Sequence, residues 1–286
     1  MSIPPYTLTM PRERTTSVVF ASPHSGRDYS PEFIQDSVLD EQALRSSEDA
    51  YVDQLYASVA DHGAPFLVSR TPRAYVDLNR GPEELDPALI NGLRRVDHNP
   101  RVSSGLGVIP RVVAGGRAIY RGKMSLRDAQ ARLVQHWQPY HVALQSLLDC
   151  SHATFDEAIL IDCHSMPHEA VSSLTKDEGR CPQIVLGDRF GASAAPDIVG
   201  RVEAAFVRAG FETARNTPFS GAYMAQHYGR PSRGQHVVQV EIDRSLYLDE
   251  QMVRPSNDFL QIRARLSSVI AEIADIGRSE NALAAE

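Results

Sequence analysis

Short apolar runs that alternate with stretches of helical periodicity are the feature that most limits how this chain can fold. The runs lie at residues 17–22, 65–69, 74–78, 158–163, 182–187 and 235–242. Several are continuously apolar and rich in Val and Ile, which is typical of strands covered on both faces. Strands that alternate with helices predict an α/β fold around a largely parallel or mixed sheet.

The helical stretches have recognisable start and stop signals. They lie at residues 47–63, 125–150, 196–210 and 255–277. Ser47 is a candidate N-cap and Gly63 a stop for the first, whereas Ser125 begins a capping-box pattern in the second. Pro139 predicts a kink or break within that second helix. Residues 109–122 predict a hairpin that turns at Ala114-Gly115-Gly116.

Composition excludes several classes of protein. With 286 residues, 42% of them hydrophobic, and no internal linker, we expect one domain over residues 1–286. The formal net charge of −7 argues against a nucleic-acid partner. No run approaches the ~18 apolar residues that span a bilayer, and the N-terminus has no signal-peptide pattern, so we expect a cytoplasmic protein that does not bind membranes. The three cysteines lack C-x-x-C spacing, which argues against a disulfide framework.

Two of the apolar runs end in a histidine. His24 follows the apolar run in "SVVFASPHSG", and His164 follows the apolar run in "EAILIDCHSMP". Because ligands gather at the carboxyl ends of strands in open α/β sheets, we expect both side chains at one edge of the sheet. Imidazole is the commonest protein ligand of zinc, and catalytic zinc usually has three protein ligands. The pair therefore indicates two ligands of a metal site, although either histidine alone could be structural.

The third ligand is sought among the acids near Ser47. Helical periodicity over residues 47–63 places Asp49 and Asp53 on the stripe that includes Val52 and Tyr56. Burial of a carboxylate is costly unless a metal, an arginine or firm hydrogen bonds compensate. Asp49 is thus a candidate ligand; alternatively it only caps the helix and complements its dipole.

Two further segments carry candidate substrate and catalytic groups. "AYVDLNRG" places Asn79 and Arg80 after a strand-like run, where an Arg fork can bind a carboxylate, unless the tripeptide is only a surface loop. "VVQVEIDRSLY" places Glu241 within an apolar run, and a Glu beside a metal-bound water is the usual arrangement for metal-assisted hydrolysis. Alternatively, Glu241 faces solvent with Gln239 and Asp243 on an amphipathic strand.

Seven segments together resemble one family. "SPHSG", "SEDAYVDQLY", "YVDLNRG", "GVIPRVV…IYRGK", "DCHSMP", "PFSGAYMAQHYGRP" and "VQVEIDRSLYLDE" occur in the order typical of N-formylglutamate amidohydrolases (deformylases). The resemblance covers roughly residues 15–265. That family is distantly similar to zinc carboxypeptidases and aspartoacylases, which implies a three-layer α/β/α fold around a central mixed, largely parallel sheet.

The resemblance also implies roles for individual residues. One zinc ion (Zn2+) is expected to be bound by His24, Asp49 and His164, with Glu48 as the alternative acid. The related enzymes hold their first His and acid in H-x-x-E, whereas here the acid lies 24 (Glu48) or 25 (Asp49) positions after His24. Asp49 is favoured because it shares the predicted inward face with Asp53. The remaining implied residues are Glu241 as the catalytic base, Asn79 and Arg80 for one substrate carboxylate, and Arg111 and Arg121 for a second.

The activity that the resemblance implies is zinc-dependent hydrolysis of N-formyl-L-glutamate to formate and L-glutamate, a step of histidine degradation. The partner would then be a small anionic N-acyl amino acid. Hydrolysis of another N-acyl amino acid or a small peptide is the nearest alternative. A non-catalytic metal- or ligand-binding protein of the same fold is a third hypothesis, against which Glu241 argues, since a binder needs no general base. The oligomeric state stays open.

Overall fold

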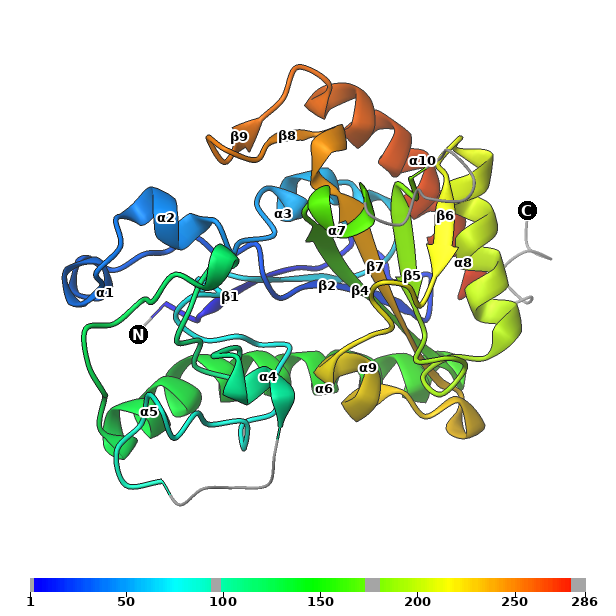
Figure 1. Ribbon diagram of the computed structural model, residues 1–286. Helices are drawn as coiled ribbons and strands as arrows, with labels where there is room; N and C mark the ends of the chain where they lie inside the picture. The colour runs from blue at the N-terminus through cyan, green and yellow to red at the C-terminus, as the bar shows by residue number, and fades with distance from the viewer. Residues whose placement is uncertain (1–2, 94–98, 173–180, 279–286) are drawn as a thin grey trace. The chain divides into compact units, whose positions relative to one another are not determined.

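A seven-stranded mixed sheet runs through the computed structural model, which describes residues 3–93, 99–172 and 181–278 (Figure 1). The strand order is β1-β3-β2-β4-β7-β5-β6. Strands β2, β4 and β7 are parallel neighbours, β5 is antiparallel to β7, and β6 is parallel to β5. The strand bounds are β1 Tyr6–Thr9, β2 Val18–Ser22, β3 Phe66–Ser69, β4 Ala158–Met166, β5 Ile184–Gly187, β6 Thr213–Arg215 and β7 Gln235–Asp243. A separate antiparallel pair comprises β8 Leu248–Asp249 and β9 Arg254–Pro255.

The chain divides into two compact units and passes repeatedly from one to the other. The first comprises Met1–Thr7, Pro23–Ala50 and Val68–Ala143. The second comprises Leu8–Ser22, Tyr51–Leu67 and Leu144–Glu286. The expectation of one domain over the whole chain stays a prediction.

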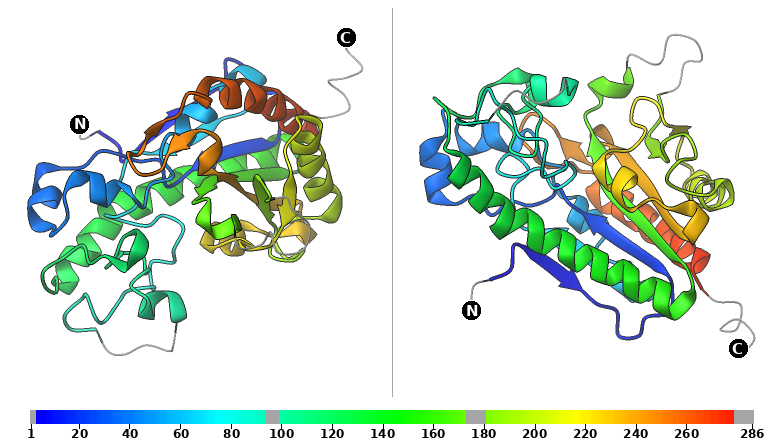
Figure 2. Two further views of the ribbon diagram at one scale, coloured as in Figure 1. Left: turned by 45° about the horizontal axis from the view of Figure 1, so that its top comes forward. Right: turned by 90° about the horizontal axis from the view of Figure 1, so that it is seen from below.

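In the second unit, helices cover both faces of the sheet. Figures 1 and 2 show α10 (Phe259–Ile276) on one face, where it packs against α8 (Pro196–Arg208), α3 (Val52–Leu55) and β2. The C-terminal part of α6 (Gln138–Phe155) and the short α9 (Tyr223–Tyr228) lie on the other face, with α9 against β7. Every residue of β2 and β4 is buried, as their continuous apolar runs predict. The expected three-layer α/β arrangement is confirmed.

The first unit consists of short helices and turns around an aromatic core. Phe33, Leu44 and Ile119 belong to this core. The Arg132 guanidinium lies 3.9 Å from the centre of the Tyr75 ring, a cation–π contact that stabilises the core. The helices are α1 Pro31–Asp36, α2 Glu41–Arg45, α4 Pro100–Ser103 and α5 Leu126–Arg132. None of the helices in the described ranges is both long and apolar enough to cross a membrane.

One predicted strand is wrong. Residues 74–78 are buried except for the partly exposed Tyr75, but they form no strand, and the N–H groups of Tyr75 and Val76 both donate to the Pro72 carbonyl. These two bonds and a bond from the Asp77 N–H to the Val108 carbonyl pair three N–H groups of the segment, which helps to bury the apolar run without strand pairing. Conversely, β1 and β6 were not predicted, since both are short, partly exposed strands at the edges of the sheet.

The predicted helix over residues 47–63 is also wrong. Only α3 and a 3-10 turn, η1 (Val59–His62), form there, and Asp49 precedes both. Tyr51 is in the left-handed region with φ of 63°, which interrupts any helix from Ser47. The Asp49 N–H donates instead to the His24 carbonyl at 3.0 Å, so a contact distant in sequence replaces the first helical turn. Gly63 ends the segment in the left-handed conformation, as predicted.

The segment around Pro139 stays helical. The Asp128 N–H donates to Ser125 Oγ at 3.1 Å, which confirms the predicted N-cap of α5. A π turn, η3 (Leu133–Trp137), connects α5 to α6, and the Gln138 N–H donates to the Leu133 carbonyl. This widened turn accommodates Pro139, which has no N–H to continue the α-helical pattern. Residues 109–122 form no pair of strands, so the predicted hairpin is reduced to one antiparallel bridge between Val112 and Ala118 on either side of the turn.

Candidate active site

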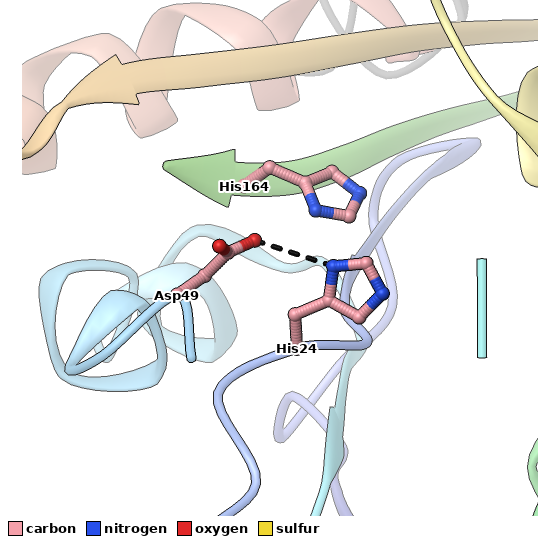
Figure 3. Close-up of side chains that lie close together, drawn as sticks. All are labelled: His24, Asp49 and His164. Atoms are coloured by element: carbon pink, nitrogen blue, oxygen red, sulfur yellow. Dashed lines mark ion pairs between the residues drawn. The ribbon is translucent and has the colours of Figure 1, made fainter. Parts of the chain in front are cut away.

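His24, Asp49 and His164 form a compact group of possible metal ligands. One ligand atom from each residue lies within 4.8 Å of the other two. All three residues are buried, with exposed fractions of 2%, 1% and 3% in that order. Figure 3 shows the side chains pointing toward one another, with an ion pair of 3.4 Å between His24 Nδ1 and Asp49 Oδ2. Two imidazoles and a carboxylate are the donor set of many catalytic zinc sites.

Backbone contacts hold His24 and Asp49. His24 follows the last residue of β2 by two positions, and a bridge joins Gly26 to Pro72. A Cβ on Gly26 would collide with the Thr71 carbonyl, so this close approach requires glycine. Together with the bond from the Asp49 N–H to the His24 carbonyl, these contacts fix where both side chains begin.

A buried carboxylate orients the His24 ring. His24 Nε2 donates to Asp77 Oδ1 at 2.7 Å. Asp77 also accepts from the Asn79 N–H at 2.8 Å and from Arg73 Nε at 3.1 Å. Burial opposes ionisation of Asp77, but His24 and Arg73 outweigh it and hold the pKa of this carboxyl well below its ordinary value. Asp77 thus acts as an ionised acceptor that leaves Nδ1 of His24 facing Asp49.

His164 has the same arrangement. Asp162 and His164 lie two residues apart on β4, so their side chains project to the same face of the strand. His164 Nε2 donates to Asp162 Oδ1 at 2.8 Å, and the other ring nitrogen faces the group (Figure 3). Metal-binding histidines usually donate their second ring nitrogen to a carboxylate, which fixes the tautomer. The side chains present therefore fit a divalent metal such as zinc.

The roles of Asp77 and Asp162 were missed in the sequence. For Asp162 a signal was available, since an Asp two residues before a strand histidine shares its face. For Asp77 no local signal exists, because it lies 53 positions from His24.

The two candidate acids differ in their surroundings. Asp49 lies in the group with the histidines, whereas Glu48 Oε1 accepts from Arg45 Nε at 3.1 Å. Burial raises the pKa of the Glu48 carboxyl, and Arg45 opposes the rise. The reason given for Asp49, a helical face shared with Asp53, is wrong because Asp49 is not helical. The backbone bond to His24, rather than helical periodicity, brings Asp49 to the group.

Glu241 lies beside His164 in the sheet. The two residues are paired in register on the parallel strands β7 and β4 and project to the same face. Glu241 is 8% exposed and Gln239 is 4% exposed, and Asp243 is also buried. The alternative, in which these three residues form a solvent-exposed face, is therefore wrong. Gln239 Nε2 donates to Glu241 Oε1 at 2.8 Å.

Asn79 and Arg80 are buried in turns of the first unit rather than at the end of a strand. Arg80 Nε donates to the Leu106 carbonyl at 3.0 Å, and its Nη1 donates to the Asn79 carbonyl at 3.1 Å. Burial lowers the pKa of the Arg80 guanidinium, and Asp77 opposes this shift. The possibility of an ordinary surface loop is thus wrong for this pair.

The two other arginines are placed differently. Arg111 Nε donates to Asp86 Oδ2 at 2.8 Å, and its Nη2 donates to the Ser103 carbonyl at 3.4 Å. Arg121 is exposed. Their role in binding a second substrate carboxylate stays a prediction, and Arg111 already has a carboxylate partner.

Comparisons with known proteins agree on one family. Residues 16–248 match the N-formylglutamate amidohydrolase family. N-formylglutamate deformylase of Pseudomonas aeruginosa is 30% identical over 238 residues, 82% of this chain and 83% of that protein. The deformylase of Pseudomonas putida is 28% identical over 236 residues, 82% of each chain. The crystal structure of N-formylglutamate amidohydrolase from Ralstonia eutropha superposes with a TM-score of 0.89 at 31% identity, covering 96% of this chain and 99% of that one. The chain belongs to the N-formylglutamate amidohydrolase family.

Proposed function

We propose that this chain hydrolyses N-formyl-L-glutamate to formate and L-glutamate with a bound divalent metal, zinc by preference. The observation that carries the proposal is the pair of histidines, each oriented by a buried carboxylate, grouped with Asp49. The substrate follows from the names of the relatives, which are N-formylglutamate deformylases. A place in histidine degradation rests on the family resemblance alone, and a cytoplasmic location rests on sequence pattern alone; both stay predictions.

In this proposal His24, Asp49 and His164 hold the metal. When bound, such an ion polarises a carbonyl oxygen and lowers the pKa of water. Glu241 accepts a proton as water attacks the formyl carbon, and later donates it to the amide nitrogen as the C–N bond breaks. Glutamate leaves as the neutral amine together with formic acid, and the remaining proton of the water passes from the acid to the amine, so that the final products are formate and an ammonium group.

Substrate binding is assigned to cationic and amide groups of the first unit. Arg80 is buried and oriented by two carbonyls, so its guanidinium is preorganised to bind one carboxylate of the substrate. The side-chain amide of the neighbouring Asn79 is assigned to the same substrate carboxylate. Arg111 and Arg121 are the candidates for the second carboxylate, and Arg111 would have to share its guanidinium with Asp86.

The proposal is tested by formate release from N-formyl-L-glutamate. Purified protein is stripped with a chelator, assayed, and assayed again after zinc is returned. Activity that disappears and returns with zinc supports both the reaction and the metal. Formate release that survives complete removal of metal contradicts the metal role. If zinc binds but no formate appears, the substrate assignment is wrong, and a panel of N-acyl glutamates and aspartates identifies the acyl group that is cleaved.

A further inference from the structure

Gln239 is a buried amide that connects Glu241 to a distant loop. It lies on β7 two residues before Glu241, so both side chains project to the same face of the strand. Its Oε1 accepts from the Ala222 N–H at 3.0 Å, and its Nε2 donates to Glu241 Oε1 at 2.8 Å. The Gln239 side chain therefore bridges the backbone before α9 and the carboxylate assigned as the general base.

The Ala222 N–H determines which way the amide faces. A backbone N–H can only donate, so the group opposite it must be the amide oxygen of Gln239. The NH2 end is then directed at Glu241, which accepts through its carboxylate. A hydrogen bond of this kind restricts rotation of the carboxylate and so fixes the direction in which its oxygens face.

The loop that supplies Ala222 is itself held firmly. The Arg189 N–H donates to the Ser220 carbonyl at 2.7 Å. A Cβ added to Gly187, the last residue of β5, would lie 2.7 Å from the Gly221 nitrogen, so the loop packs directly on the backbone of β5. Gly221 has φ of +106°, a conformation that L side chains rarely adopt. The donor at Ala222 therefore has a fixed position relative to the end of β5.

We propose that Gln239 is a positioning residue for the proton transfer by Glu241, with its own orientation set by the Ala222 N–H. This inference rests on the proposed function for the role of Glu241. If Gln239 had a purely structural role, its amide would only satisfy buried polar groups, and its loss would alter stability or substrate binding rather than the chemical step.

The test is a double-mutant cycle between Gln239 and Glu241. Gln239→Met removes both hydrogen bonds at similar volume, and Gln239→Asn keeps an amide that is one methylene too short to bridge both partners. We expect either change to lower kcat about 10- to 100-fold with KM within about threefold, because small displacements of a catalytic group cost this much. In a Glu241→Gln background the same changes should lower kcat no further, since Gln239 acts through Glu241. An equal loss in both backgrounds would overturn the proposal.

Gln235→Met is the matched control. Gln235 lies four residues earlier on the same face of β7, and its Nε2 donates to the Tyr228 carbonyl. We expect its kcat within about twofold of wild type. If wild type releases no formate, the proposed function fails, and the cycle is measured with whichever N-acyl amino acid it does hydrolyse.

A crystal structure of Gln239→Met gives a readout that does not depend on activity. The Glu241 carboxylate should rotate away from its wild-type orientation. A side chain that keeps this orientation without the amide would refute the positioning role, whatever the substrate.

Discussion

Replacement of Asp162 by Asn should weaken metal binding while leaving the fold intact. Asp162 is fully buried and accepts from His164 Nε2 at 2.8 Å. The Asn side chain has nearly the same shape, and its Oδ1 can still accept that hydrogen bond. The change therefore removes the negative charge behind the imidazole but keeps the tautomer and the ring orientation.

The expected size of the effect follows from this geometry. Asp162 accepts from the ring nitrogen of His164 that is not directed at the metal group, and loss of such a partner typically lowers metal affinity 10- to 100-fold. This corresponds to about 1.4–2.8 kcal/mol of binding free energy. The lower part of the range is expected, because Asn keeps a neutral hydrogen bond that is about half as strong as the charged one. Asp77 is less suited to this test, since it also accepts from Arg73 and the Asn79 N–H.

Zinc affinity is measured by competition with a chromophoric chelator, for wild type and for Asp162→Asn. Urea unfolding of both proteins in excess chelator separates an effect on folding from an effect on binding. Asp275→Asn is the matched control, because Asp275 is exposed and pairs with Arg278 near the C-terminus of α10. Zinc affinity within about twofold of wild type in a folded Asp162→Asn protein would show that Asp162 does not support the metal site, and so would an equal loss in the control.

Three further outcomes are expected. Glu241→Gln should bind zinc normally but lose about 10²- to 10⁴-fold in kcat, and near-normal turnover would remove Glu241 from the chemistry. Arg80→Ala should raise KM for N-formyl-L-glutamate at least about tenfold, and an unchanged KM would contradict its role as a carboxylate ligand. The hydrogen bond from His168 Nδ1 to Asp243 raises the pKa of His168, so this contact stabilises the fold fully below about pH 6.5 and progressively less as pH rises through the raised value. His168→Gln should therefore lower the urea midpoint more at about pH 5.5 than at about pH 8.5, and an equal loss at both would refute this.

Much of the second unit could be predicted from local pattern. The runs at 158–163 and 235–242 correspond to β4 and β7, because a continuously apolar segment rich in β-branched residues is stable when buried on both faces. The helices α8 and α10 were predicted from their periodicity, although α10 begins at Phe259 rather than at the predicted residue 255, and the short α9 was not predicted. The failures lie where local turns are combined with a single backbone bond to a distant segment, from Asp49 to His24 and from Asp77 to Val108.

The residues of the candidate site could also be predicted only in part. The histidines after β2 and within β4, and the glutamate within β7, could be proposed because each residue type is rare in an apolar run and has a specific chemical use. Asp49 could be named, but the reason for choosing it over Glu48 was wrong. Gln239 was considered only as part of an exposed face, since a single strand does not show what lies across from it.

The α/β class and the residue types that a metal-dependent hydrolase requires can be read from the amino-acid sequence, because hydrophobic periodicity and chemical identity are properties of short segments. Which carboxylate accepts from which histidine, and which way the Gln239 amide faces, depends on the folded chain. Asp77 is 53 positions from His24, and Ala222 is 17 from Gln239. Contacts over such separations depend on how distant segments of backbone pack and satisfy one another's hydrogen bonds, and no local pattern encodes this.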